Sequence, residues 1–255
     1  MRKTIIAGNW KLFKTIPEAI DLANGIKREL LDCVNVDVVL CPVYTALSEV
    51  AEIIQDTDIK LGAQDLYWQD EGAFTGEVSG KMLLDAGCSY VIIGHSERRQ
   101  FFAETNETVN KKIKAALKIG LTPIVCCGEM LAEREAGNTF KVLDDHIKNG
   151  LTGLSEEEAL KIVIAYEPVW AIGTGKTASP IQAQEAHKYI RDQLAKLYNK
   201  DTADAIRLQY GGSVKPENIT ELMKQPDVDG ALVGGASLQV ASFSEIVKKA
   251  STVKK

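Results

Sequence analysis

Glu167 is the first residue whose type and position suggest chemistry. It ends a run of apolar residues that begins at Ile162, and Pro168 follows it directly. A carboxylate in such surroundings is partly desolvated, and desolvation raises its pKa toward the range of a useful general base. The sequence therefore predicts proton abstraction by Glu167.

His95 and Lys11 also follow short hydrophobic runs. His95 comes after Tyr90–Gly94 and precedes Ser96, a residue type that often begins a helix. The positive end of that helix favours a neutral imidazole, which can donate a hydrogen bond to a substrate oxygen. Lys11 supplies positive charge. Taken alone, His95 fits a structural role as well as a catalytic one, and Lys11 fits an ordinary solvated lysine.

Small residues near the ends of three further runs are suited to binding phosphate. Backbone N–H groups of Gly173, Ser213, Gly234 and Gly235 can hold a phosphate beside a short helix. Two nucleotide motifs fit poorly here. A P-loop would need glycine at position 170, where this chain has Trp170. The dinucleotide-like pattern that begins at Gly173 is separated from the preceding strand by five residues, whereas a true dinucleotide motif follows its strand directly.

An apolar, glycine-containing segment after Glu167 predicts a mobile lid. Such a lid excludes water from a reactive intermediate when it closes. The predicted lid consists of Pro168, Val169, Trp170, Ala171, Ile172, Gly173, Thr174, Gly175, Lys176, Thr177 and Ala178.

Eight β-branched runs alternate with helical patterns and must position these residues. Near-continuous hydrophobicity is typical of parallel strands that are covered on both faces. About 32 residues per unit and no linker predict one α/β domain over residues 1–255, a closed (β/α)8 barrel in preference to an open doubly wound sheet. Reactive groups then share the mouth at the carboxyl ends of the strands. The predicted strands are Thr4–Gly8, Val36–Cys41, Ile59–Gln64, Tyr90–Gly94, Thr122–Cys127, Ile162–Glu167, Arg207–Gly211 and Gly230–Gly234.

Composition excludes several classes of partner. The net charge is −5 and no basic run exceeds two residues, which argues against a nucleic-acid or anionic-membrane partner. The longest apolar run, Gly230–Ala236, is too short for a membrane span, and the N-terminal apolar stretch is too short for a signal peptide. Five cysteines without a C-x-x-C pair predict free thiols in a reducing cytoplasm and no zinc site.

Six segments, in order along the chain, are similar to those of the triosephosphate isomerase family. The longest is Ala165-Tyr-Glu-Pro-Val-Trp-Ala-Ile-Gly-Thr-Gly-Lys176, which resembles the signature segment of that family. The resemblance covers essentially the whole chain and implies a TIM barrel. The other five segments are Ala7–Lys11, Gly72–Glu77, Gly94–Arg99, Tyr210–Ser213 and Gly230–Gly235.

The resemblance implies roles for individual residues. Glu167 takes the proton next to the carbonyl of dihydroxyacetone phosphate and returns it to the neighbouring carbon, giving D-glyceraldehyde 3-phosphate. Neutral His95 polarises the carbonyl and shuttles protons between the two oxygens of the enediolate. Lys11 and Asn9 bind the substrate and stabilise the negative charge that develops on it, and Glu97 supports the lysine and the histidine. No metal or organic cofactor is implied.

The resemblance also implies a homodimer. Asp65–Glu77 is longer than the usual connection after a strand and carries aromatic residues. Thr75 at its tip is expected to reach the mouth of the partner near Asn9 and Lys11. Asp65 replaces the asparagine usual in the family, and Cys127 stands beside the single cysteine that the family shows at Cys126.

Two rival functions come from other classes. The glycines alone would suit a barrel that binds a phosphorylated ligand without catalysis, and the pattern at Gly173 would suit a dinucleotide-dependent oxidoreductase. A coupled isomerase assay discriminates the first rival, and a test of NAD binding discriminates the second.

Overall fold

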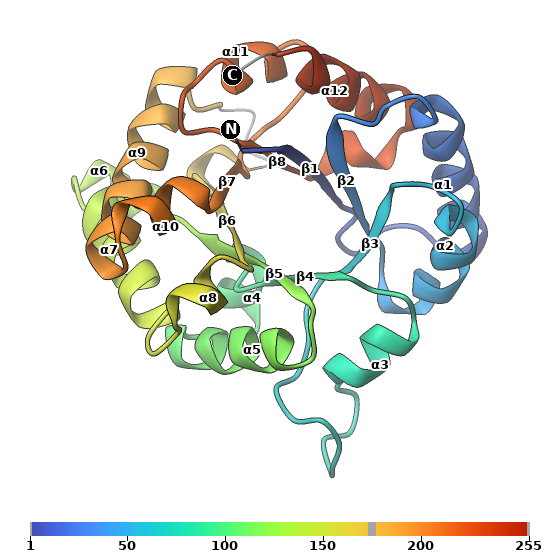
Figure 1. Ribbon diagram of the computed structural model, residues 1–255, viewed down its shortest axis with the longest axis horizontal. Helices are drawn as coiled ribbons and strands as arrows, with labels where there is room; N and C mark the ends of the chain where they lie inside the picture. Colours follow the sequence, from blue (N-terminus) through green and yellow to red (C-terminus); the bar gives the residue numbers. More distant parts are fainter. Residues whose placement is uncertain (1, 173–176, 254–255) are drawn as a thin grey trace.

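Eight parallel strands close into a barrel (Figure 1). The computed structural model describes residues 2–172 and 177–253. β1 pairs with β2 on one side and with β8 on the other, so the sheet has no edge. This closure confirms the (β/α)8 barrel and excludes the open sheet. The strands are β1 (Thr4–Asn9), β2 (Val36–Cys41), β3 (Lys60–Ala63), β4 (Tyr90–Ile93), β5 (Thr122–Cys127), β6 (Val163–Tyr166), β7 (Arg207–Tyr210) and β8 (Gly230–Val233).

Helices surround the barrel and cover the outer faces of its strands (Figure 1). The longest helices are α1 (Ile16–Leu30), α5 (Asn106–Lys118), α7 (Thr139–Gly150), α9 (Pro180–Leu197) and α12 (Val240–Thr252). The shorter elements are η1 (Tyr44–Ala46), α2 (Leu47–Ile54), α3 (Gly80–Asp85), α4 (Ser96–Phe101), α6 (Leu131–Glu135), α8 (Glu156–Ala159), η2 (Val169–Ala171), α10 (Lys200–Ala205), α11 (Ile219–Met223) and η3 (Gly235–Leu238).

The hydrophobic core has two parts because strand residues point alternately to opposite faces of the sheet. The inner part fills the barrel and includes Ile5, Ala7, Ile92, Ile124 and Ala165, all completely buried. The outer part lies between the strands and the helices, and it accounts for most of the buried apolar side chains. Burial on both faces explains the continuous apolar runs in the sequence.

Several helices begin at capping boxes, α9 and α1 among them. At α9 the box is complete: the Ser179 backbone N–H donates to Gln182 Oε1 at 2.9 Å, and the Gln182 backbone N–H donates to Ser179 Oγ at 3.2 Å. At α1 the Thr15 backbone N–H donates to Glu18 Oε2 at 2.8 Å. Such caps satisfy backbone groups that a helix end leaves without partners.

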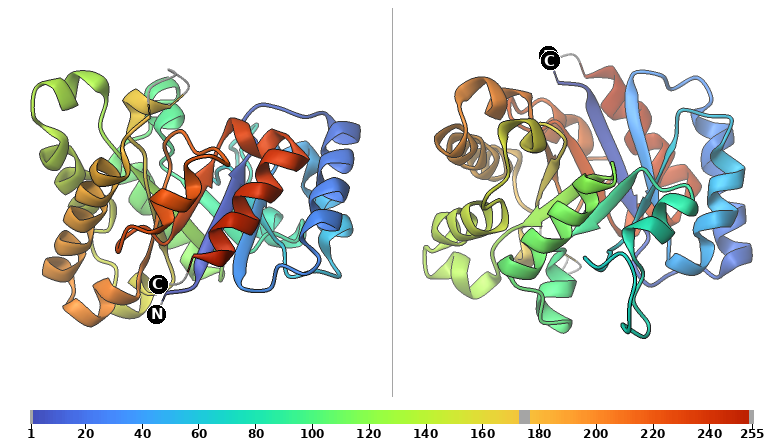
Figure 2. Two further views of the ribbon diagram at one scale, coloured as in Figure 1. Left: turned by 90° about the horizontal axis from the view of Figure 1, so that it is seen from above. Right: turned by 60° about the horizontal axis from the view of Figure 1, so that its bottom comes forward.

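The long connection between β3 and α3 projects from the barrel at the bottom of Figure 1, and its projection is also visible in the right panel of Figure 2. A hydrogen bond from the Tyr67 backbone N–H to the Val78 carbonyl, 2.8 Å long, closes its base. The Tyr67 ring lies 4.1 Å from the Trp68 ring and 4.7 Å from the Phe74 ring, centroid to centroid. The three rings therefore pack together within the projecting loop. Among the helices that the structure describes, none has the length and apolar character needed to cross a bilayer.

Candidate active site

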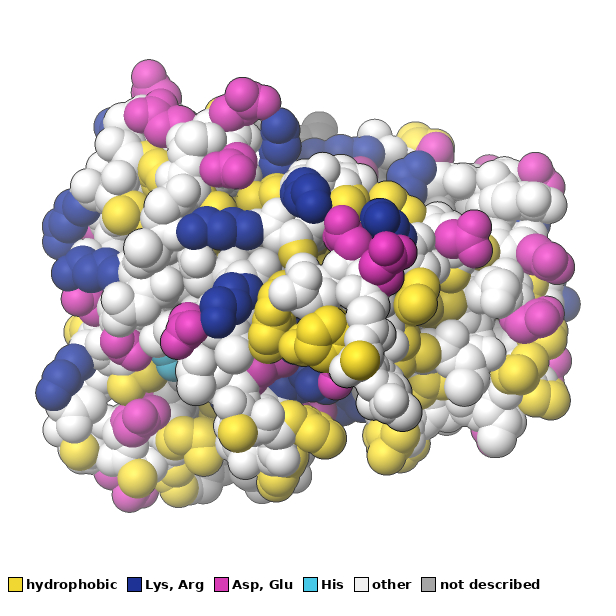
Figure 3. All heavy atoms as spheres, turned by 90° about the horizontal axis from the view of Figure 1, so that it is seen from below, with side chains coloured by type: hydrophobic (Ala, Val, Ile, Leu, Met, Phe, Trp, Pro, Cys, Tyr) yellow, Lys and Arg dark blue, Asp and Glu magenta, His cyan; other side chains and the backbone are white. Residues whose placement is uncertain are grey.

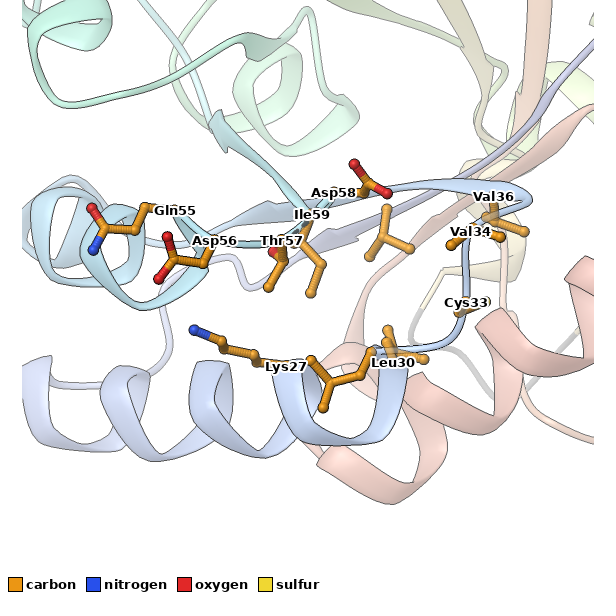
Figure 4. A pocket seen from close by; sticks show the side chains of 12 residues that line it. Lys27, Leu30, Cys33, Val34, Val36, Gln55, Asp56, Thr57, Asp58 and Ile59 are labelled. Atoms are coloured by element: carbon orange, nitrogen blue, oxygen red, sulfur yellow. Dashed lines mark hydrogen bonds between the residues drawn. The ribbon is translucent and has the colours of Figure 1, made fainter.

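A cavity of about 1080 Å³ opens at the carboxyl ends of the strands. Its lining includes Asn9, Lys11, Gln64, His95 and Glu97, so four of the predicted site residues meet there. A second cavity, of about 340 Å³, lies between the end of α1 and the turn before β3, at the opposite end of the barrel (Figure 4). Its lining includes Lys27, Cys33, Asp56 and Asp58 and contains none of the predicted site residues.

Glu167 follows β6 directly and is buried, with 2% of its surface exposed. Its Oε1 lies 2.9 Å from His95 Nε2, and its Oε2 accepts a 3.0 Å hydrogen bond from the Ser96 backbone N–H. Burial raises the pKa of Glu167, but the charge and hydrogen bond of His95, together with Ser96, outweigh burial and lower it below its ordinary value. The expectation of a raised pKa is therefore wrong for this state of the site. Glu167 is therefore held as a carboxylate by these partners.

His95 occupies the N-cap position of α4. Its Nδ1 accepts a 3.2 Å hydrogen bond from the Glu97 backbone N–H, so Nδ1 carries no proton and Nε2 donates to Glu167. This pattern belongs to a neutral imidazole. Burial lowers the pKa of His95, while Glu167 and then Glu97 raise it further than burial lowers it. Because Glu167 is the main cause of that rise, any movement of Glu167 away from the ring favours the neutral imidazole.

Lys11 has a strained backbone, with φ at +51°. Only a few per cent of residues other than glycine adopt this region, and such outliers gather at functional sites. The Lys11 backbone N–H donates to Asn9 Oδ1 at 3.0 Å, and Lys11 Nζ lies 2.6 Å from Glu97 Oε1. Glu97 Oε2 lies 3.6 Å from His95 Nδ1. Glu97 thus lies beside both groups: its carboxylate pairs with Lys11, and its backbone N–H donates to His95 Nδ1.

Two glycines give Glu167 the space it occupies. A Cβ atom on Gly128 would lie 1.7 Å from the Glu167 carbonyl oxygen, and one on Gly211 would lie 2.9 Å from Glu167 Cγ. Neither residue was predicted to matter for catalysis. The sequence gives no signal for Gly128, because the strand it follows and the strand it touches are about 40 residues apart.

Three of the predicted phosphate-binding residues, Ser213, Gly234 and Gly235, follow β7 and β8, which are neighbouring strands. A Cβ atom on Gly234 would lie 3.4 Å from Lys11 Cε, so this backbone faces the lysine. Gly235 begins η3 and has open space beside it. Ser213 follows β7, and its carbonyl accepts a 2.9 Å hydrogen bond from Asn218 Nδ2. Gly173 lies outside the described residues.

Comparison with known proteins identifies the family. The sequence model of the triosephosphate isomerase family matches residues 4–250. The chain belongs to this family. Proteins named triosephosphate isomerase from Geobacter metallireducens and Moorella thermoacetica are 60% and 58% identical over 247 residues, or 97% of this chain and 98% of each relative. The one from Trichlorobacter lovleyi is 58% identical over 248 residues, or 97% of this chain and 99% of that relative.

Within this barrel, Glu129 contacts Val169 and Trp170, two residues near the start of the predicted lid. Glu129 is completely buried and was not predicted as a site residue. Its Oε1 accepts a 2.9 Å hydrogen bond from Trp170 Nε1, and both carboxylate oxygens lie within 3.2 Å of the Tyr166 hydroxyl. Its carbonyl accepts from the Val169 backbone N–H at 3.1 Å. Of the predicted lid, Gly173, Thr174, Gly175 and Lys176 lie outside the described residues.

Asp65 lies in a buried charged cluster with Arg98, Glu104 and Lys112. Lys112 Nζ lies 2.7 and 2.8 Å from the two carboxylate oxygens of Asp65, and Lys112 also pairs with Glu104. Arg98 Nε lies 2.8 Å from Asp65 Oδ2 and 2.8 Å from Glu104 Oε1. Burial raises the pKa of Asp65 most strongly, Lys112 opposes it and Glu104 adds to it, and the resulting pKa is about 6.

Replacing Asp65 with Asn is expected to stabilise the protein above pH 6. Between pH 3.8 and about pH 6, Asp65 is protonated in the folded protein but ionised in the unfolded chain. The raised pKa of Asp65 therefore lowers the free energy of unfolding as the pH rises. The full loss is reached above about pH 6, and there is no loss below pH 3.8. Asp65→Asn should raise the free energy of unfolding by on the order of 2 kcal/mol at pH 8 and by less at pH 5. Urea unfolding at both pH values measures this, and a less stable variant at pH 8 would show that the ion pairs outweigh burial.

Proposed function

We propose that the protein interconverts dihydroxyacetone phosphate and D-glyceraldehyde 3-phosphate. The observation that carries the proposal is the contact between Glu167 and His95, beside the Lys11–Glu97 pair, at the mouth of a barrel of the triosephosphate isomerase family. One carboxylate, one imidazole with a donor nitrogen and one ammonium group are what proton transfer next to a carbonyl needs.

The reaction begins when Glu167 moves away from Ser96 and takes a proton from the carbon next to the substrate carbonyl. The electron pair of that C–H bond forms the enediolate, whose negative charge lies on the former carbonyl oxygen. His95 Nε2 then donates a hydrogen bond to that oxygen, and the Lys11 ammonium group stabilises its charge. His95 moves the hydroxyl proton of the enediolate from the oxygen on the carbon that lost its proton to the former carbonyl oxygen. Glu167 returns its proton to the former carbonyl carbon, so the carbonyl group re-forms on the other carbon and no cofactor takes part.

Binding of the phosphate falls to the backbone N–H groups of Ser213, Gly234 and Gly235, with Gly173 from the lid. Lys11 faces Gly234 and carries positive charge toward this end of the site. Backbone N–H groups and a lysine together are an established way to hold a phosphate.

A coupled assay tests the function. Purified protein is mixed with D-glyceraldehyde 3-phosphate, and formation of dihydroxyacetone phosphate is followed with a reducing enzyme and NADH. Turnover supports the proposal. Binding of phosphoglycolate without turnover would instead support a barrel that binds a phosphorylated ligand, and calorimetry with NAD tests the oxidoreductase alternative.

We also propose that two copies of the chain associate through the side of the molecule that carries the Asp65–Glu77 loop. Figure 3 shows this side, with hydrophobic side chains gathered in its lower half. Leu12 is 93% exposed, Phe101 72% and Phe102 65%, and Phe74 on the loop is 40% exposed. Such a group of exposed apolar residues is costly to leave in water. The loop of each copy then docks beside Lys11 of the other, with Thr75 at its tip.

Sedimentation tests this association. At sub-micromolar concentration the protein should have twice the chain mass of 27.8 kDa. Thr75→Arg places a long cation next to Lys11 of the partner and should yield monomers with lower kcat, whereas Thr75→Ser should remain dimeric. A fully active monomer of the unaltered protein would contradict the proposal.

Tyr210 is expected to latch the closed lid. A Cβ atom on Gly212 would lie 2.2 Å from the Tyr210 hydroxyl oxygen and 3.0 Å from Pro168 Cγ. The phenol therefore lies near Pro168, the first residue of the predicted lid. Burial raises the pKa of Tyr210 to about 12, and the backbone N–H of Ala178, the last residue of the predicted lid, opposes that rise. The phenol thus lies between both ends of the lid.

Tyr210→Phe should therefore weaken phosphoglycolate binding by about 2- to 12-fold, which corresponds to a lost hydrogen bond of about 0.5–1.5 kcal/mol. The open lid exposes the enediolate, so the fraction of substrate lost as methylglyoxal should rise. Both quantities are measured beside Tyr198→Phe, a control outside the site. Unchanged values for Tyr210→Phe would show that this tyrosine does not hold the lid.

The five cysteines are free thiols in the structure, and four of them are buried. We propose a cytoplasmic location on this ground, because free thiols persist in reducing compartments.

A further inference from the structure

We propose that Gln64 is a positioning residue for catalysis, because its side-chain amide holds Lys11 in its strained backbone conformation. The inference rests on the proposed function, in which the Lys11 ammonium group stabilises the enediolate. Gln64 directly follows β3, and its half-buried side chain lines the cavity at the mouth.

The Gln64 amide joins the ends of three strands. Its Nε2 donates to the Lys11 carbonyl at 2.9 Å and to the Cys41 carbonyl at 3.0 Å. A primary amide has two N–H groups, so both are used. The Cys41 carbonyl also accepts from the Trp10 backbone N–H at 3.1 Å, and it therefore keeps a donor without Gln64. For the Lys11 carbonyl, Gln64 supplies the one hydrogen bond found among the described residues.

Lys11 is held at three points, and Gln64 provides the one that acts on its carbonyl. Asn9 Oδ1 accepts from the Lys11 backbone N–H, and Glu97 pairs with Lys11 Nζ. A residue with a side chain disfavours φ near +51° and relaxes to negative φ when its peptide groups are free to rotate. Leu12, the next residue, is 93% exposed, so packing within the protomer does not fix the peptide between residues 11 and 12.

Loss of the Gln64 amide consequently lets this peptide rotate and moves Nζ away from Glu97 and from the substrate. A displacement of about 1 Å in a catalytic group can lower the rate about 100-fold. The loss of activity caused by removing the Gln64 amide therefore depends on the Lys11 ammonium group. In a variant without that group, removing the Gln64 amide should cause little further loss.

A double-mutant cycle tests this route. Gln64→Met keeps the length of the side chain and removes both donors. We expect it to lower kcat/KM and phosphoglycolate affinity by about 10- to 100-fold in the unaltered background, and by less than about 2-fold in a Lys11→Met background. Gln184→Met is the matched control, because Gln184 also uses its amide in two hydrogen bonds, to Asp227, far from the mouth. It should change neither quantity.

Equal losses in both backgrounds would overturn the proposal, since Gln64 would then act without Lys11. No loss in the unaltered background would overturn it as well. Thermal unfolding confirms that each variant is folded, and Gln64→Leu, which also lacks the donors and adds no charge, replaces Gln64→Met if that variant does not fold. Calorimetry with phosphoglycolate needs no turnover. It therefore separates failure of this inference from failure of the isomerase assay, which would be seen in the unaltered protein.

Discussion

Replacement of Glu167 with Gln is expected to lower kcat by about 10²- to 10⁴-fold, the usual cost of losing a general base. Glutamine has the shape of glutamate, and its side-chain oxygen can still accept from the Ser96 backbone N–H, a 3.0 Å bond in this structure. It cannot take a proton from carbon. The change therefore removes the chemistry and leaves most of the packing around a side chain that is 2% exposed.

Three measurements accompany that of kcat. The melting temperature and phosphoglycolate affinity of Glu167→Gln should change much less than its turnover. Glu107→Gln, in the first turn of α5, removes an exposed carboxylate that does not line the cavity and should behave like the unaltered protein. Near-normal turnover of Glu167→Gln would assign the base to another residue.

The barrel itself was predictable because its information is local. Every predicted strand lies within one residue of the observed strand at each end. Apolar runs such as Tyr90–Ile93 are buried on both faces, and capping residues such as Ser179 act within one helical turn. Such signals depend on neighbours in the sequence, so reading them requires no knowledge of which strands pair.

The electrostatics of the site were not predictable in the same way. Glu167 was expected to have a raised pKa because its own strand is apolar, yet its pKa is lowered by His95 and Ser96, which lie 72 and 71 residues away in the sequence. Gln64 and Glu129 went unassigned for a related reason. Gln64 contacts Lys11, and Glu129 contacts Trp170. In each pair the two residues follow different strands, so only the folded barrel brings them together.

Closure of the barrel also makes one glycine indispensable. Gly128 follows β5, and the Cys127 carbonyl before it accepts a 2.8 Å hydrogen bond from the Glu167 backbone N–H. A Cβ atom on Gly128 would lie 1.7 Å from the Glu167 carbonyl oxygen, whereas real Cβ atoms stay at least 3.0 Å from such neighbours. Because the obstacle is backbone, no rotation of a side chain relieves it. The carboxyl end of β6 must move, and Glu167 moves with it.

Gly128→Ala is therefore expected to lower kcat/KM by about 100-fold or more, since a 1 Å shift of a catalytic group has an effect of that size. Overpacking of this kind also destabilises a fold by about 1–3 kcal/mol. Gly150→Ala is the matched control: Gly150 lies in α7, its Cβ would make an ordinary 3.8 Å contact, and alanine favours the helix. Activity assays and urea unfolding of both variants check the prediction. Full activity in Gly128→Ala would mean that the ends of β5 and β6 can separate without displacing the base.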